Sequence, residues 1–175
     1  MKKEQVRIGL INPKSPGNVG AVMRAAGCFR VDAVYYTGGR YNRAAKFNMD
    51  TKNVRRHIPL TGVANLLDHV PENMNIVCVE MVEGAAALPG YQHPEKAFYI
   101  FGPEDGTISQ EIIDSADAVV YVPTAGCMNL AAAINVVLYD RLSKSDLAIA
   151  DDDLIRKNRD TNNTVKINAL AEKAG

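Results

Sequence analysis

Three short segments of the sequence combine glycine, asparagine and charged residues in a way that could hold a small ligand. The first covers residues 12–20 and leads into a stretch of helical spacing that carries Arg24. Its glycines allow the backbone to approach a ligand closely, and the first turn of a helix offers unpaired amides to an anionic group. The segment lacks the lysine and hydroxyl pair of a Walker A loop and the three-glycine spacing of a dinucleotide fingerprint. The pattern therefore disfavours a nucleotide triphosphate site.

The second and third segments each follow an apolar run. Residues 101–106 contain a glycine that can admit a ligand against the backbone and a fixed carboxylate at Glu104. Residues 122–130 place Cys127 and Asn129 at the expected start of a long helix, where backbone amides are exposed. An ordinary turn would also explain the second segment, and an N-cap role for Asn129 would explain the third.

The spacing of Asn18 and Arg24 limits what these two side chains can do together. They are six residues apart, so about 240° separates them around an α-helix and they cannot share one face. Either Asn18 acts from the N-cap while Arg24 points elsewhere, or the two meet different partners, for instance across a subunit boundary. A plain N-cap for Asn18 and a surface salt bridge for Arg24 are the simpler alternatives.

Short apolar runs alternate with helix-length stretches along the chain. This order predicts an α/β fold with a mostly parallel sheet flanked by helices. Ligands of open α/β sheets collect where the strands end, and each of the three segments follows a predicted strand. The predicted strands cover residues 6–11, 31–36, 75–79, 97–101 and 118–122, and the predicted helices cover 18–27, 42–47, 63–67 and 129–142.

Length and composition indicate one folded domain. The chain has 175 residues, of which 47% are hydrophobic and 23% charged, as is typical of soluble globular domains. The composition becomes more polar after Ser143. We therefore expect a domain over residues 1–143 and a polar tail over 144–175, with helix near 151–157.

Twenty basic and twenty acidic side chains cancel, so any nucleic-acid binding must be local. The strongest candidate is the basic stretch 40–57, in which Asp50 is the only acidic residue. Such a stretch could contact phosphates, or it could be a solvated surface loop. The candidate contacts within it include Arg40, Arg43, Arg55 and Arg56.

The cysteines and the apolar runs exclude other classes of protein. Cys28, Cys78 and Cys127 are an odd number without CxxC spacing, which argues against a zinc site and against a secreted disulfide framework. No apolar run approaches the roughly 20 residues of a membrane span. We therefore expect a cytoplasmic protein that uses no metal and no membrane.

In this combination and order, the three segments resemble the SpoU (TrmH) branch of the knotted SPOUT methyltransferases. The first family motif is asparagine, glycine and arginine, the second is Phe-Gly-x-Glu-x-x-Gly, and the third is hydrophobic-Pro followed by Ser-hydrophobic-Asn-Leu. Two positions depart from the pattern: Cys127 stands where the family usually has serine, and Ala131 follows Leu130 where serine or another small residue is common. The second motif is matched nearly in full, by Phe101, Gly102 and Glu104 with the neighbouring Asp105 and Gly106. The matching residues are Asn18, Gly20 and Arg24 in the first motif, and Val122, Pro123, Cys127, Met128, Asn129 and Leu130 in the third.

The resemblance implies a fold and a reaction. The fold would carry a deep trefoil knot near its C-terminal end, an exception to the rule that chains avoid threading. The reaction would be methylation of a ribose 2'-hydroxyl of RNA by S-adenosylmethionine, leaving S-adenosylhomocysteine, in a homodimer with the site at the subunit boundary. The implied catalytic residues are Arg24, Asn18, Glu104 and Asn129, and the implied cofactor-binding residues are Glu80, Gly102, Val122, Cys127 and Leu130.

The identity of the RNA and the activity itself leave alternatives. The core begins almost at Met1, without an N-terminal RNA-binding extension, which favours a compact substrate such as a tRNA anticodon loop over rRNA. Cysteine is a weaker hydrogen-bond partner than serine, so Cys127 also keeps open an inactive RNA-binding relative. A flavodoxin-like or nucleotide-binding module would explain the α/β pattern but not the three ordered motifs.

Overall fold

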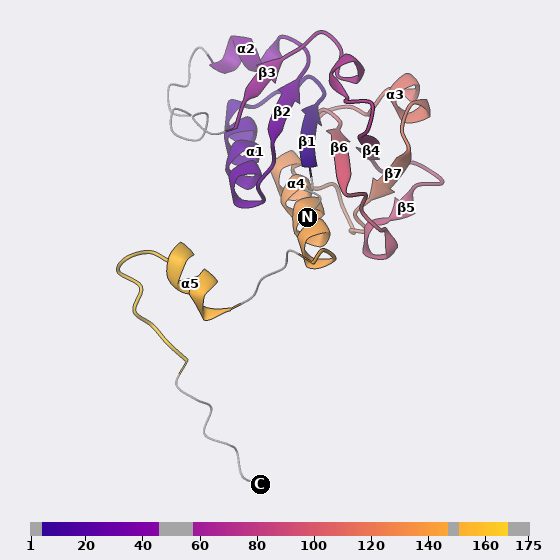
Figure 1. Cartoon of the computed structure of the whole chain (residues 1–175). Helices are drawn as coiled ribbons and strands as arrows, with labels where there is room; N and C mark the ends of the chain where they lie inside the picture. The colour runs from indigo at the N-terminus through magenta and orange to yellow at the C-terminus, as the bar shows by residue number, and fades with distance from the viewer. Residues whose placement is uncertain (1–4, 46–57, 147–150, 168–175) are drawn as a thin grey trace.

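The computed structural model describes residues 5–45, 58–146 and 151–167. Within these ranges seven strands form one sheet in the order β3-β2-β1-β6-β4-β7-β5, and every strand pair is parallel (Figure 1). The elements are β1 (Gln5–Leu10), α1 (Pro16–Cys28), β2 (Ala33–Tyr36), α2 (Arg40–Ala45), β3 (Leu60–Gly62), η2 (Leu67–His69), β4 (Asn75–Val79), β5 (Ala86–Ala87), η3 (Leu88–Gly90), β6 (Lys96–Phe101), α3 (Gln110–Asp114), β7 (Ala118–Tyr121), α4 (Leu130–Ser143) and α5 (Asp152–Asn158).

Side chains that alternate along β6 divide the core into two layers. Tyr99 and Phe101 belong to the cluster that α1 and α4 cover, whereas Phe98 and Ile100 belong to the cluster beneath η2 and α3. The alternation follows from the two-residue period of a β-strand. The central strand is therefore buried on both faces, as a parallel sheet between two helical layers requires.

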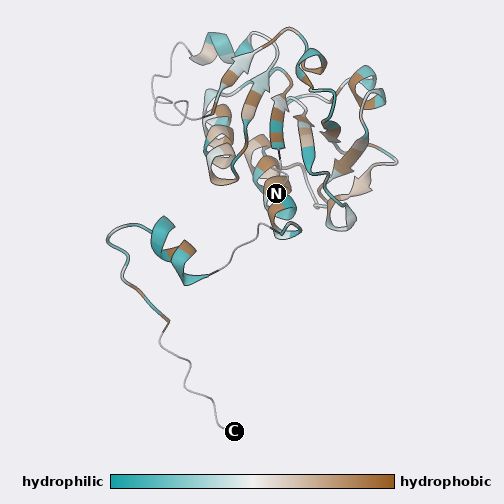
Figure 2. Ribbon diagram, in the orientation of Figure 1, coloured by the Kyte–Doolittle hydropathy of each residue, from teal (hydrophilic) through white to brown (hydrophobic). Residues whose placement is uncertain are grey.

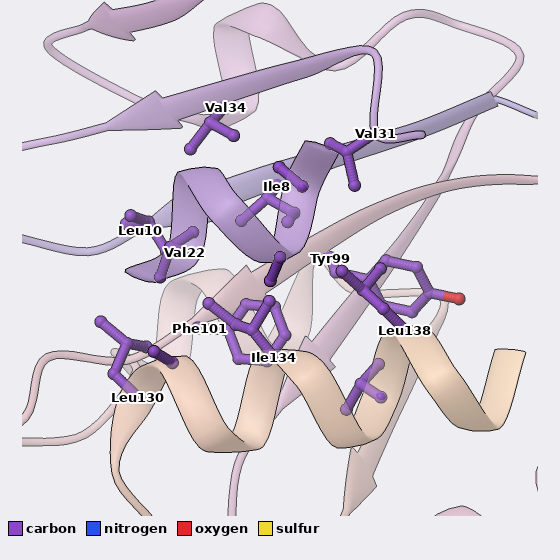
Figure 3. Close-up of a cluster of buried hydrophobic side chains, with 14 of the residues drawn as sticks. Ile8, Leu10, Val22, Val31, Val34, Tyr99, Phe101, Leu130, Ile134 and Leu138 are labelled. Atoms are coloured by element: carbon purple, nitrogen blue, oxygen red, sulfur yellow. The ribbon is translucent and has the colours of Figure 1, made fainter. Parts of the chain in front are cut away.

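Helices α1 and α4 pack against each other and against one face of the sheet. Ile8 and Leu10 of β1 meet Val22 of α1, and Ile134 and Leu138 of α4 complete the layer (Figure 3). Each fully buried aliphatic side chain of this kind contributes about 1.5–3 kcal/mol relative to its exposed state. In Figure 2 brown segments recur along the inner strands, whereas α2 and α5 are mostly teal.

Helix α1 begins two residues earlier than the sequence predicted. Ser15 is its N-cap and accepts the backbone N–H of Asn18 at 3.3 Å, and Pro16 occupies the first helical position. Proline fits there because the N–H it lacks would have no partner within the helix. The interpretation of Asn18 as an N-cap is therefore wrong, and its side chain is available for contacts outside the helix.

The α/β architecture with a parallel sheet is confirmed, but the helix predicted over residues 63–67 is wrong. That segment is irregular and ends in the single turn of η2. Asn65 explains the break, because its side chain accepts the N–H of Leu67 at 3.1 Å and donates to Asp68 at 3.1 Å. Such local side-chain bonds compete with helical backbone bonds. The sequence also gave no sign of β3 and β5, which have three and two residues.

A buried polar cluster joins the end of α4 to the loop before β6. The imidazole of His93 lies between two oxygens, with Nδ1 2.6 Å from the hydroxyl of Tyr99 and Nε2 2.8 Å from Oδ2 of Asp140. Burial raises the pKa of Tyr99 to about 12, against the opposing effect of Arg141. Burial also lowers the pKa of His93, and this outweighs the hydrogen bond to Asp140.

Two cations at the end of α4 bind the same loop through its backbone carbonyls. Arg141 is 6% exposed and donates to the carbonyl oxygens of Pro94 at 2.6 Å and Glu95 at 2.9 Å. Lys144 donates to the carbonyl oxygens of Leu88 at 2.7 Å and Tyr91 at 3.1 Å. We call these two side chains, with the loop 88–95 that they bind, the α4 latch.

The free energy of unfolding is expected to fall as the pH drops below about 6.5, because burial lowers the pKa of His93 and the folded protein therefore takes up this proton at lower pH than the unfolded chain. Protons then bind the unfolded chain preferentially, while Asp140, Arg141 and Lys144 face the neutral ring. Urea unfolding across this pH range measures the slope. The variant H93N should flatten the dependence of the free energy of unfolding on pH, and the control H69N, at an exposed histidine, should leave it unchanged. An unchanged dependence in H93N would show that His93 is not its source.

Residues 151–167 stand apart from the rest of the described chain. Asp151 caps α5 by accepting the N–H of Leu154 at 2.7 Å, and Arg156 pairs with Asp153 within the helix. No hydrogen bond or ion pair joins this segment to residues 5–45 or 58–146. The division of the chain at Ser143 and the trefoil knot both stay predictions. Among the described residues no helix is long and apolar enough to cross a membrane.

Candidate active site

The loops that carry the three sequence segments meet at the carboxyl edge of the sheet. β1 lies beside β6, and β4 lies between β6 and β7. After β1 the chain enters α1 on one face, whereas after β6 it enters α3 on the opposite face. Neighbouring strands whose connections leave in opposite directions create the crevice in which open α/β sheets bind ligands. The candidate site lies at this crevice.

Glu104 ties the loop after β6 to the loop after β1. Its carboxylate accepts the backbone N–H of Lys14 at 2.9 Å and of Ser15 at 3.3 Å, and the side-chain amide of Asn18 at 2.9 Å. Desolvation raises the pKa of Glu104, but the bonds from Asn18, Lys14 and Ser15 together lower it below the ordinary value. Glu104 is therefore a carboxylate near neutral pH and acts as an acceptor rather than as a general acid.

Asn18 extends this connection to the third segment. Its Oδ1 accepts the side-chain amide of Asn129 at 3.0 Å, and Oδ1 of Asn129 accepts the N–H of Ala131 at 2.9 Å and of Ala132 at 3.4 Å. The N-cap role considered for Asn129 is therefore correct, and it coexists with a contact to Asn18. Since each amide donates and accepts, the orientation of both side chains follows from the network.

Glu104, Asn18 and Asn129 thus form a continuous hydrogen-bonded path, which we call the three-motif bridge. It joins residues that are 86 and 111 positions apart in the chain. Three of the four predicted catalytic residues therefore lie together. Their donors and acceptors are largely used in holding one another, which suits them to fixing the shape of the site.

Glu80 supports the second loop from the neighbouring strand. Its carboxylate accepts the N–H of Met81 at 3.0 Å and the N–H of Ile108 at 3.1 Å. Gly102 lies directly against this carboxylate, and a Cβ there would stand 2.9 Å from Oε2 of Glu80 and 3.4 Å from Cγ1 of Ile108. Two of the predicted cofactor-binding residues therefore pack against each other, with Glu80 engaged by backbone amides.

Replacing Gly102 with alanine is expected to weaken ligand binding at this edge about tenfold, because the new methyl group would push Glu80 from the amide of Ile108. Titration calorimetry with S-adenosylmethionine measures the effect. Gly90 offers a matched control, since a Cβ at that position meets nothing within 4 Å. Equal affinity for G102A and G90A would show that the close packing at Gly102 is unimportant.

The remaining predicted cofactor-binding residues surround the third loop. Val122 is partly buried against the core, Leu130 is buried, and Cys127 is exposed. Among the described hydrogen bonds, no backbone N–H of residues 124–129 has a partner. A Cβ at Gly126 would also meet nothing within 4 Å. The loop therefore presents open amides and space for a ligand beside an apolar wall.

Arg24 is not brought to the three-motif bridge. It is exposed on α1, and among the described residues it makes no hydrogen bond or ion pair. The salt bridge considered for Arg24 is therefore absent from this part of the chain. Asn18 points to Glu104 and Asn129 from the first turn of the same helix, so the angular argument from their spacing is confirmed.

The predicted RNA contacts fall into three groups. Arg55 and Arg56 lie outside the described residues. Arg43 is exposed on α2. Arg40, at the start of α2, donates to both carboxylate oxygens of Asp105 at 2.7 and 2.9 Å. The sequence gave no signal for this pair, because neither helical nor strand periodicity relates two residues 65 positions apart.

No group of three or more metal-binding side chains occurs among the described residues. The exposed thiol of Cys127 lies in the third loop, and Cys78 is buried, with its pKa raised to about 12 by burial and by the charge of Glu80. A thiol with so high a pKa is inert near neutral pH. Cys78 is therefore a core residue.

A family model and many solved structures resemble the chain. The model of the SpoU rRNA Methylase family matches residues 5–139. A TrmH-family protein from Porphyromonas gingivalis superimposes with a TM-score of 0.70 and 20% sequence identity, over 81% of this chain and 61% of that one. No curated protein sequence matches the chain.

Two further structures share the fold. The SpoU methyltransferase AviRb from Streptomyces viridochromogenes, in complex with the cofactor AdoMet, gives a TM-score of 0.66 with 18% identity, over 81% of this chain and 58% of that one. A chain solved in work on the 2-OH methylation of C/U34 on tRNA gives 0.69 with 20% identity, over 82% of this chain and 92% of that one. The chain therefore spans less than two thirds of the P. gingivalis and AviRb chains.

Proposed function

The chain belongs to the SpoU rRNA Methylase family, and on this premise we propose that it transfers a methyl group from S-adenosylmethionine to a ribose 2'-hydroxyl of RNA. The observation that carries the proposal is the three-motif bridge. Glu104, Asn18 and Asn129 come from the three segments that resemble the family motifs, and their side chains bond to one another at the carboxyl edge of the sheet.

The loops after β4, β6 and β7 fit S-adenosylmethionine. The unpartnered amides of residues 124–129 and the space at Gly126 suit a polar nucleoside that lies against the backbone. Val122 and Leu130 supply apolar surface beside them. When bound, S-adenosylmethionine supplies an activated methyl group. Glu80 and Gly102 would hold the loop after β6 in place for it.

The ribose hydroxyl must be aligned for attack and relieved of its proton as the new bond forms. Positioning provides much of such an effect, and a fixed positive charge stabilises the oxygen as it becomes negative. We assign this role to Arg24, whose guanidinium is free of protein partners among the described residues. An arginine is always protonated in proteins, so Arg24 orients and stabilises rather than acting as a base.

We further propose that Arg24 acts in a homodimer, at a site on the partner subunit. The exposed face of α1 is lined by small residues around Arg24, namely Gly17, Ala21 and Cys28. Helix α4 packs beside α1 and exposes Val136 and Tyr139. Small and apolar side chains on two adjacent helices suit a self-complementary interface. This arrangement would explain why Arg24 and Asn18 point apart.

A tRNA is the proposed substrate, in a cytoplasmic enzyme. The support is the fold shared with the chain solved in work on the 2-OH methylation of C/U34 on tRNA. The match covers 92% of that chain. An rRNA substrate is the second possibility, favoured by the description of the family. Arg43, Arg55 and Arg56 are proposed to contact the RNA backbone. Charge reversal at Arg55 and Arg56 should weaken RNA binding and reduce its dependence on salt.

Titration calorimetry with S-adenosylmethionine and S-adenosylhomocysteine, followed by ribose-methylation mapping of tRNA and rRNA, tests the proposal. Micromolar binding of either compound and a methylated 2'-hydroxyl in one RNA are the expected results. RNA binding without methyl transfer would instead indicate an inactive relative, the alternative that Cys127 keeps open. Absence of binding to both compounds would overturn the proposed activity.

A further inference from the structure

We propose that Arg40 and Asp105 form a positioning pair that fixes the loop after β1 against the loop after β6 and thereby places the three-motif bridge for methyl transfer. The inference rests on the proposed function for its readout in catalysis. It assigns to Arg40 a role within the protein in place of a direct contact with RNA.

The geometry of Arg40 links two loops through one side chain. Its Nη1 donates to both carboxylate oxygens of Asp105, while Nε donates to the carbonyl oxygen of Asn12 at 3.0 Å and Nη2 donates to the same oxygen. All three nitrogens of the guanidinium are therefore engaged. Planar, charge-assisted bonds of this kind give geometric specificity that a flexible ammonium group does not.

The loop after β1 is built to present its carbonyl to Arg40. Asn12 has a φ of 43°, a left-handed conformation that asparagine tolerates better than most residues. Its N–H donates to Oγ1 of Thr37 at 3.2 Å, and its side chain lies against Gly38, where a Cβ would stand 2.2 Å from Oδ1 of Asn12. The segment just before Arg40 thus holds Asn12 in place from a second direction.

Asp105 and Glu104 act on the same loop as consecutive carboxylates. Glu104 binds the backbone amides of Lys14 and Ser15, and Asp105 binds Arg40 and lies 3.6 Å from Nζ of Lys14. The hydrogen bond from Arg40 lowers the pKa of Asp105 and keeps it ionised. Loss of the pair would leave Glu104 and the longer, exposed contact of Lys14 with Asp105 as the side-chain links between the two loops. A shift of about 1 Å in a positioning group can cost about 100-fold in rate.

If Arg40 instead contacted RNA directly, removing the charge of Asp105 would have a different effect. In that case Asp105 would compete with phosphate for the guanidinium, so removing its charge would strengthen RNA binding. In a positioning pair, removal of either partner has the same consequence. The two roles can therefore be separated by comparing the variants R40Q and D105N.

The experiment measures kcat, the KM for RNA and the Kd of S-adenosylmethionine for R40Q, D105N and the double variant. Each single variant is expected to lower kcat about tenfold, with the KM for RNA within about twofold, and the double variant should be no worse than either one. R40K should not restore kcat, because lysine cannot bond Asn12 and both oxygens of Asp105 together. Lys96, at the amino end of β6, provides the control variant K96Q.

An increased RNA affinity in D105N would overturn the proposal. So would a defect of R40Q that lies in the KM for RNA, together with a decrease of about 0.9 in the slope of log RNA affinity against log salt concentration. If the unaltered protein transfers no methyl group, the proposed function fails and the pair is tested by hydrogen exchange. Faster exchange of the Lys14 and Ser15 amides in both variants, but not in K96Q, would support it. Unchanged exchange would overturn it.

Discussion

Replacing Arg24 with alanine is expected to lower kcat about 100-fold while changing the Kd of S-adenosylmethionine less than about twofold. The side chain is exposed and has no partner among the described residues, so its loss costs the fold little. It also lies away from the loops that would bind the cofactor. Single-turnover methylation of RNA together with titration calorimetry measures both quantities. The variant K96A, altered at the amino end of β6 and so away from the carboxyl ends of the strands, should match the unaltered protein.

Mixed dimers test whether Arg24 serves the partner subunit. R24A and N129A should each be inactive alone, because each damages every site. If Arg24 acts across the interface, co-expression should restore about a quarter of the activity, since half of the dimers are mixed and one of their two sites is intact. No recovery in mixed dimers would place Arg24 in the same subunit as Asn129, and full activity of R24A would remove it from the mechanism.

Replacing Arg141 with methionine is expected to lower the free energy of unfolding by about 3 kcal/mol, because buried acceptors lose a charged donor. Arg141 donates to the carbonyls of Pro94 and Glu95 and to the hydroxyl of Tyr99 at 3.2 Å. Methionine fills a similar volume, so most of the loss reflects the polar contacts. Urea unfolding monitored by circular dichroism measures the difference.

The variant R156M provides a matched control for the α4 latch. Arg156 also forms ion pairs within a helix, but its side chain is 57% exposed and its partners Asp152 and Asp153 are more exposed still. Exposed pairs of this kind contribute about 0–1 kcal/mol. A loss below about 1 kcal/mol in R141M, similar to that in R156M, would show that the latch does not stabilise the fold.

The sequence predicted the long and strongly patterned elements and missed those that depend on tertiary contacts. The apolar runs of β1, β4, β6 and β7 and the stripe of α4 follow from the strand and helix periods. Strands β3 and β5 are too short to show any alternation. The sequence suggested Asn18 as the N-cap of α1, whereas Ser15 caps the helix and Pro16 follows it. Local chemistry at Asn65 ended a helix that propensity alone favoured.

The candidate site was predictable as a set of residues but not as a set of contacts. Glu104, Asn18 and Asn129 could be selected from motif spacing, and their bonds to one another required the coordinates. Neither the link between Arg40 and Asp105 nor the burial of Arg141 has a sequence signal. Charged residues are usually exposed, so the sequence favours a surface role for both arginines. Both arginines have partners within the protein because the fold brings loops that are distant in the sequence close to them.

The position of β1 inside the sheet, between β2 and β6, has a consequence for how the chain folds. Gln5 lies opposite Lys96, so β1 receives its second neighbour only after about ninety further residues have been ordered. Until then one side of β1 is an open strand edge, and Val6, Ile8 and Leu10 form an apolar row along one face of the strand. Non-local parallel pairing of this kind folds slowly and leaves partly folded chains prone to aggregate. Refolding should therefore proceed best at low protein concentration, with pairing of β1 and β6 as its late step.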